Sequence, residues 1–180
     1  MDEVGRGPLA GPVVACAVIL KETRFTTKVF DSKRLTPSLR RAAFAQIINN
    51  AHVGVGIVDR EIIDRDNILQ ATIAAIKQAL ANLPLKPQYL LLDGGFRNQV
   101  FPYPAKSVIG GDGRCLSIAC ASIVAKVIRD NLMAYYSALY PQYGFERNRG
   151  YGTKEHIQAI QQYGITPIHR CSFSPIGGGR

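Results

Sequence analysis

The sequence contains no long apolar run. Its longest apolar stretches, residues 13–20 and 89–92, are far shorter than the roughly 20 residues that a transmembrane helix requires. No basic segment precedes a hydrophobic stretch, as it does in a secretory signal peptide. These absences predict a cytoplasmic protein that does not contact a membrane.

Motifs for zinc binding and for covalent catalysis are missing as well. The four cysteines stand apart, without a CxxC pair or a histidine at zinc-ligand spacing, and are interpreted as reduced thiols. No Ser/His/Asp or Cys/His arrangement indicates a covalent intermediate. His52 and His156 are interpreted as structural or surface residues. The pair His169–Arg170 is either a phosphate contact or part of a solvated tail.

Acidic residues are the minority charge. Asp and Glu number 13 against 22 Lys and Arg, which gives a net charge of +9. Such a surplus favours a polyanionic partner such as nucleic acid, because basic side chains neutralise phosphates and release counterions. The 180 residues, 47% of them apolar, are typical of one globular unit with a sizeable core. Residues 1–180 are therefore predicted to form a single domain.

The pattern of apolar residues predicts an α/β protein. Four segments are predicted as strands: residues 13–20, 52–59, 89–92 and 106–109. Four others have the apolar spacing of helices: residues 36–49, 67–83, 117–140 and 153–163. Strands come first and mixed elements follow, so we expect a central sheet with helices packed on it.

Four acidic residues stand at predicted strand ends or turns: Asp2, Glu3, Asp93 and Asp112. Each alone is explained by a solvated surface, a turn or a helix cap. Together at one sheet end, they would repel each other unless cations neutralised them. Carboxylate oxygens suit Mg²⁺ or Mn²⁺ rather than zinc, and a pair of such ions supports phosphodiester hydrolysis.

Three further phrases allow both a structural and a functional interpretation. The GRG sequence at residues 5–7 is a tight turn or a backbone that approaches a ligand closely. The DSKR sequence at 31–34 is a helix-cap region or a phosphate clamp. The GYGT sequence at 150–153 holds a packed tyrosine or a ring that stacks on a sugar or base.

These motifs together identify a family resemblance. The chain resembles ribonuclease HII over nearly its whole length, through DEVGRGPLAGPVVACAVIL, DSKRLT, NILQAT, LLDGG, LSIACASIVAKVIRD, YGFERNRGYGTKEH and HRCSFSPI. The resemblance implies a ribonuclease H-like fold: a mixed five-stranded sheet flanked by helices, with a helical C-terminal part from about residue 141. It also implies an endonuclease that acts on RNA–DNA hybrids and on DNA duplexes containing ribonucleotides, as a monomer, in DNA replication and repair.

The resemblance also assigns roles to residues. It implies cleavage that leaves a 3′-hydroxyl and a 5′-phosphate and that uses two Mg²⁺ or Mn²⁺ ions. The family's catalytic and metal-binding acids fall on Asp2, Glu3, Asp93 and Asp112. Its motif for the ribose 2′-hydroxyl falls on Gly5, Arg6 and Gly7, and its junction-sensing tyrosine on Tyr151. Residues in the flanking phrases are predicted to contact phosphates: Ser32, Lys33, Arg34 and Lys154.

The chain departs from the family pattern in three places. Gly110 and Gly113 replace a lysine and a serine around Asp112, and Asn148-Arg149 replaces a His-Lys pair before the GYGT phrase. The family also has an apolar half-strand before its Asp-Glu pair, where this sequence has only Met1. We therefore expect a truncated or misassigned start, with an apolar stretch of about four to eight residues upstream.

Two other functions compete with this interpretation. A non-catalytic nucleic-acid-binding domain would keep the fold and lose the chemistry, but all four acids are present. Another ribonuclease H-like nuclease, such as a resolvase or integrase relative, would lack the GRG and GYGT phrases. Cleavage of a duplex that holds one ribonucleotide distinguishes all three.

Overall fold

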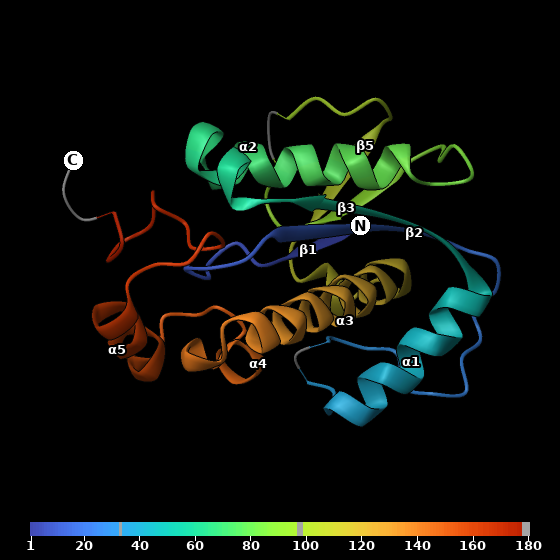
Figure 1. Ribbon diagram of the computed structural model, residues 1–180. Helices are drawn as coiled ribbons and strands as arrows, with labels where there is room; N and C mark the ends of the chain where they lie inside the picture. The colour runs from blue at the N-terminus through green and yellow to red at the C-terminus, as the bar shows by residue number, and fades with distance from the viewer. Residues whose placement is uncertain (33, 97–98, 178–180) are drawn as a thin grey trace.

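The strands form two sheets that meet at the N-terminus of the chain. The computed structural model describes residues 1–32, 34–96 and 99–177 (Figure 1). Strands β1 (Asp2–Val4), β2 (Val13–Leu20) and β3 (Ala51–Val58) pair antiparallel in the order β1-β2-β3. Strands β4 (Leu90–Asp93) and β5 (Ala105–Val108) form a parallel pair.

Met1 connects the two sheets. Its amino group donates a 2.7 Å hydrogen bond to the carbonyl of Leu91, and its carbonyl accepts a 3.1 Å bond from the N–H of Asp93. These bonds place β4 beside β1, so the five strands follow the order β3-β2-β1-β4-β5. The expected mixed five-stranded sheet is confirmed, and Asp2 and Asp93 come to lie on neighbouring strands.

Helices cover both faces of the sheet because β2 is apolar on both sides. Its residues 13, 15 and 17 belong to one buried cluster with helix α2 (Arg60–Ala81), and residues 14 and 16 belong to another with α1 (Pro37–Asn50) and α3 (Leu116–Leu139). Figure 1 shows α2 on one side of the strands and α1 and α3 on the other. Gly56 on β3 allows close packing, because a Cβ there would overlap the carbonyl of Ala75 on α2. This continuous apolar strand is typical of a sheet buried on both faces.

Helix α2 begins earlier than the predicted residue 67. It runs from Arg60, and Asn67 interrupts it with a non-helical φ of 71° and ψ of 166°. The Asn67 side-chain oxygen accepts hydrogen bonds from the N–H groups of Leu69 and Gln70. Asn67 thus caps the second part of the helix, which is the part that the apolar spacing predicts.

The last third of the chain is largely helical and returns to the first loop. The 3₁₀ turn η2 (Pro141–Tyr143), α4 (Phe145–Asn148) and α5 (Lys154–Tyr163) follow α3. Residues 168–170 then pair with residues 9–11, through the bonds Gly11 N to Ile168 O (2.9 Å) and Arg170 N to Leu9 O (2.8 Å). The predicted helical C-terminal part is confirmed. Within the described ranges, no helix is both long and apolar enough to cross a bilayer.

Candidate active site

Three of the four predicted acids meet at one end of the sheet. Asp2 lies on β1, Asp93 is the last residue of β4, and Asp112 lies in the 3₁₀ turn η1 (Gly111–Gly113). One carboxylate oxygen from each of the three residues lies within 4.8 Å of the other two. The hydrogen bonds of Met1 and the short link from β5 to η1 create this arrangement, which could hold a metal ion.

Glu3 lies next to this group but is oriented differently. Its carboxylate accepts a 3.2 Å hydrogen bond from the guanidinium of Arg6, and it is not among the three mutually close acids. Glu3 is nevertheless part of the same electrostatic environment, since Asp2 and Asp93 both raise its pKa.

Burial makes the carboxylates of Asp2 and Glu3 hold their protons unusually tightly. It raises the pKa of Asp2 to about 6, an effect opposed by a hydrogen bond from Ser122 and increased by the charge of Asp93. Burial and the charge of Asp2 raise the pKa of Glu3 to about 7. Buried acids that repel one another shift in this direction when no cation neutralises them.

The predicted phosphate-contact segment is anchored beneath the acids. Ser32 is only 3% exposed, and its hydroxyl forms a 2.9 Å hydrogen bond with that of Ser122, the partner of Asp2. Ser32 therefore lies on the buried side of the acidic site, where it contacts Asp2 through Ser122, and not on the surface that a phosphate would reach. Arg34 is exposed, with its guanidinium 5.3 Å from the Phe30 ring centroid. Lys33 lies outside the described residues.

The GRG loop and Tyr151 lie side by side. Gly5 has a φ of +93°, and a Cβ there would overlap the side chain of Arg129; glycine is therefore required. A Cβ at Gly7 would lie 3.7 Å from the ring of Tyr151. The Tyr151 side chain is 47% exposed and thus accessible to a ligand. The last predicted contact, Lys154, is exposed at the first residue of α5.

Two buried arginines support this loop, and neither function was predicted from the sequence. Arg170 donates to the carbonyls of Gly5 (2.6 Å), Arg6 (2.9 Å) and Gly11 (2.7 Å). His169 and Arg170 are both fully buried, so a phosphate contact and a solvated tail are both wrong. Arg170 donates its hydrogen bonds to carbonyls of the first loop, so these donors are not available to phosphate or water.

Arg129 performs the same task from α3. Its guanidinium donates to the carbonyls of Pro12 (3.0 Å), Ala10 (3.1 Å) and Arg149 (2.9 Å). Burial lowers the pKa of Arg129 only to about 10, so it stays charged at neutral pH. One signal could have revealed it: Arg129 falls at helical spacing with the apolar positions of the predicted helix 117–140, and an arginine on an apolar face needs buried partners.

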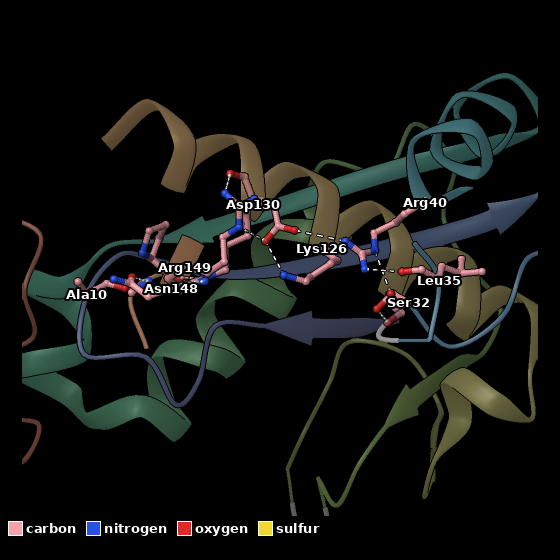
Figure 2. Close-up of polar contacts among 12 residues, drawn as sticks. Ala10, Ser32, Leu35, Arg40, Lys126, Asp130, Asn148 and Arg149 are labelled. Atoms are coloured by element: carbon pink, nitrogen blue, oxygen red, sulfur yellow. Dashed lines mark hydrogen bonds and ion pairs between the residues drawn. The ribbon is translucent and has the colours of Figure 1, made fainter. Parts of the chain in front are cut away.

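A carboxylate on α3 links two segments near the site, the one that holds Ser32 and the one that holds Arg149 (Figure 2). Asp130 accepts hydrogen bonds from Lys126 and Arg40 and lies 3.6 Å from Arg149. Arg40 in turn donates to the carbonyls of Ser32 and Leu35, at 2.9 Å each. Asp130 therefore connects the segment that holds Ser32 with the residue that precedes the GYGT phrase.

Comparison with known proteins shows the family to which the chain is similar. The family model described as Ribonuclease HII matches residues 1–176. Ribonuclease HII of Geotalea daltonii is 54% identical over 177 residues, which cover 98% of this chain and 82% of the relative. Ribonuclease HII of Enterococcus faecalis is 51% identical and covers 98% of this chain and 69% of the relative.

Solved structures show the same fold. Ribonuclease H2 from Pyrococcus horikoshii OT3 has a TM-score of 0.79 at 26% identity, covering 98% of this chain and 93% of that one. The Mn²⁺ complex of Bst-RNase HIII has a TM-score of 0.72 at 16% identity, covering 98% and 66%. On the match of the family model and the identity to these relatives, the chain belongs to the ribonuclease HII family of endoribonucleases.

Proposed function

We propose that this protein cuts on the 5′ side of ribonucleotides embedded in duplex DNA and hydrolyses the RNA strand of RNA–DNA hybrids. The products carry a 3′-hydroxyl and a 5′-phosphate. The observation that supports this proposal most strongly is the convergence of Asp2, Asp93 and Asp112 within 4.8 Å. The bond from Arg6 of the GRG loop to Glu3, and the closeness of Gly7 to the ring of Tyr151, support a ribose-specific reaction.

The residues of the acidic site fit divalent metal ions. All donors are carboxylate oxygens, which hard cations such as Mg²⁺ and Mn²⁺ prefer. Asp2, Asp93 and Asp112, with Glu3 as the fourth acid, would hold two ions. Bound there, the ions would supply activation of water and stabilisation of the leaving oxygen. The raised pKa values of Asp2 and Glu3 support this assignment, because burying these carboxylates, and placing them near other acids, is unfavourable without a counter-charge.

The remaining residues bind and orient the nucleic acid. The backbone of Gly5, Arg6 and Gly7 contacts the ribose 2′-hydroxyl, and the exposed ring of Tyr151 packs on the sugar at the junction. Arg34 and Lys154, together with Lys33, contact phosphates. Ser32 supports the acidic site from its buried side, through its hydrogen bond with Ser122. The net charge of +9 supports polyanion binding in general.

The test uses three duplexes of identical sequence: one with a single ribonucleotide, one with a full RNA strand and one of DNA alone. Each is incubated with Mg²⁺, with Mn²⁺ or with a chelator, and the products are mapped at nucleotide resolution. We expect metal-dependent cutting of the first two, on the 5′ side of the lone ribonucleotide. Tight binding without cutting would indicate a non-catalytic domain, and cutting of the all-DNA duplex would indicate a different nuclease of this fold.

A further inference from the structure

Two buried histidines connect the C-terminal segment to Tyr151. His156 lies on α5 and His169 lies in the segment that pairs with the first loop; both are fully buried. Their Nε2 atoms are 3.0 Å apart. The other ring nitrogen of His156, Nδ1, lies 2.8 Å from the carbonyl of Tyr151. The other nitrogen of His169 lies 2.8 Å from the backbone nitrogen of Thr166.

The backbone determines which ring nitrogens carry hydrogen. A backbone N–H only donates, so Nδ1 of His169 accepts from Thr166, and a neutral His169 carries its hydrogen on Nε2. That hydrogen is donated to Nε2 of His156, which leaves the hydrogen of His156 on Nδ1. His156 consequently donates to the carbonyl of Tyr151. Burial lowers the pKa of both rings, that of His169 to about 4, so both are neutral at physiological pH.

Tyr151 depends on backbone contacts for its orientation. Its ring is half exposed, and glycines flank it on both sides. Its carbonyl accepts two hydrogen bonds, one from the N–H of Thr153 (2.8 Å) and one from His156. The bond from Thr153 is local, whereas the bond from His156 connects Tyr151 to a helix and, through His169, to the first loop.

We propose that His156 and His169 are positioning residues that hold Tyr151 against the GRG loop. Through this pair, the C-terminal segment sets the preference of the enzyme for a lone ribonucleotide over a continuous RNA strand. The proposal rests on the function proposed above for Tyr151. It assigns no contact with the substrate to either histidine.

The test exploits the two nitrogens of each imidazole. An asparagine amide occupies the position of Nδ1, and a glutamine amide reaches the position of Nε2. His156→Asn therefore keeps a donor for the Tyr151 carbonyl, whereas His156→Gln loses it. At position 169 the order is reversed: His169→Gln keeps a donor for His156, whereas His169→Asn does not.

The readout is the ratio of kcat/KM on a lone-ribonucleotide duplex to kcat/KM on an RNA–DNA hybrid. Both substrates are cut by the same preparation, so the ratio does not depend on the fraction of folded enzyme. We expect the ratio to fall about threefold to tenfold in His156→Gln and His169→Asn, the equivalent of one hydrogen bond. It should change by less than about twofold in His156→Asn and His169→Gln.

A matched control separates positioning from loss of stability. Ile160 on α5 packs against a buried cluster that includes Tyr143 and Phe145, whose rings also lie against His156. Ile160→Ala should lower the melting temperature and leave the ratio unchanged. A ratio that stays at the wild-type value in all four histidine variants overturns the proposal. Wild-type enzyme that cuts neither substrate would instead contradict the proposed function.

Discussion

The carboxylate of Asp93 accepts a 2.7 Å hydrogen bond from the backbone N–H of Gly111, the residue that precedes Asp112. Asp93 therefore does two things at once. It offers a carboxylate to the acidic site, and it holds the turn that brings in the next acid. A Cβ at Gly111 would press against Ile118 and that carboxylate, so the glycine permits this close approach.

This relationship makes Asp93→Asn an informative substitution. The amide oxygen can still accept from Gly111, so we expect the fold and the position of Asp112 to persist. The substitution replaces a negatively charged metal ligand by a neutral one, and cleavage should fall on the order of a hundredfold or more. Binding of the duplex should survive, because one fewer acid repels the phosphates. Single-turnover cleavage and a binding titration measure the two effects.

Asp66→Asn is the matched control for that experiment. Asp66 pairs with Arg65 on the surface of α2, away from the acidic site, and the variant should cut at the wild-type rate. Near-normal cleavage by Asp93→Asn would mean that the acidic site is placed wrongly.

Metal binding should stabilise the protein most at high pH. Burial raises the pKa of Asp2 to about 6 and that of Glu3 to about 7. The folded protein without metal thus holds these protons more tightly than the unfolded chain, whose carboxyl pKa values are about 4. The resulting stability is present below pH 4 and is lost as pH rises through 6 to 7. A cation replaces the protons, so its stabilising effect grows over the same range.

The measurement is the rise in melting temperature on adding Mn²⁺, at pH 5 and at pH 8. At a concentration 100 times the dissociation constant, the stabilisation is about 2.7 kcal/mol, or roughly 5–10 °C for a chain of this size. The rise should be large at pH 8, small at pH 5 and much reduced in Asp93→Asn. A rise of the same size at both pH values would show that the ion binds elsewhere.

The sequence allowed the acids to be predicted but not their supports. Strand β2 and helix α3 follow from apolar runs, and the position of Asp93 at the end of β4 follows from another, whereas β1, which carries Asp2, is too short to show a pattern. Arg129 and Arg170 could not be placed in this way. Apart from the carbonyl of Arg149, their partners are backbone carbonyls 117 to 165 residues away along the chain, and a carbonyl leaves no mark in the residue pattern. Only the return of the C-terminal segment to the first loop brings them together.

Tyr151→Ala should affect one substrate more than the other. If the ring packs on the sugar at the junction, a following 2′-hydroxyl crowds it. Cutting at a lone ribonucleotide should then lose more activity than cutting within an RNA strand, by about tenfold or more for a lost stacking contact. Tyr151→Phe, which keeps the ring, should retain the preference.

Tyr163→Ala is the control, because Tyr163 is a similarly exposed tyrosine at the end of α5. Equal losses of activity on both substrates in Tyr151→Ala would show that Tyr151 has only a structural role.

Arg34→Ala tests the phosphate contacts. Arg34 is exposed, and it belongs to the segment that the hydrogen bond between Ser32 and Ser122 holds next to the acidic site. Removing one phosphate contact should weaken binding and lower the log–log slope of affinity against salt by about one unit. Lys77→Ala removes an equally exposed charge from α2, on the opposite side of the sheet from α3 (Figure 1), and should leave the slope unchanged. An unaltered slope in Arg34→Ala would show that Arg34 contacts no phosphate.

Asp130→Asn tests the ionic connection between the segment that holds Ser32 and the segment that holds Arg149. Three cations surround this carboxylate, Arg40, Lys126 and Arg149, and all four side chains are 12–30% exposed. Without the negative charge the cations repel one another in a poorly hydrated place, so we expect a loss of about 2–3 kcal/mol in unfolding free energy. Asp66→Asn breaks a more exposed pair, which water screens, and should cost much less. Chemical denaturation of both variants measures the difference. Equal costs would mean that the segments holding Ser32 and Arg149 are kept in place by their backbone contacts alone.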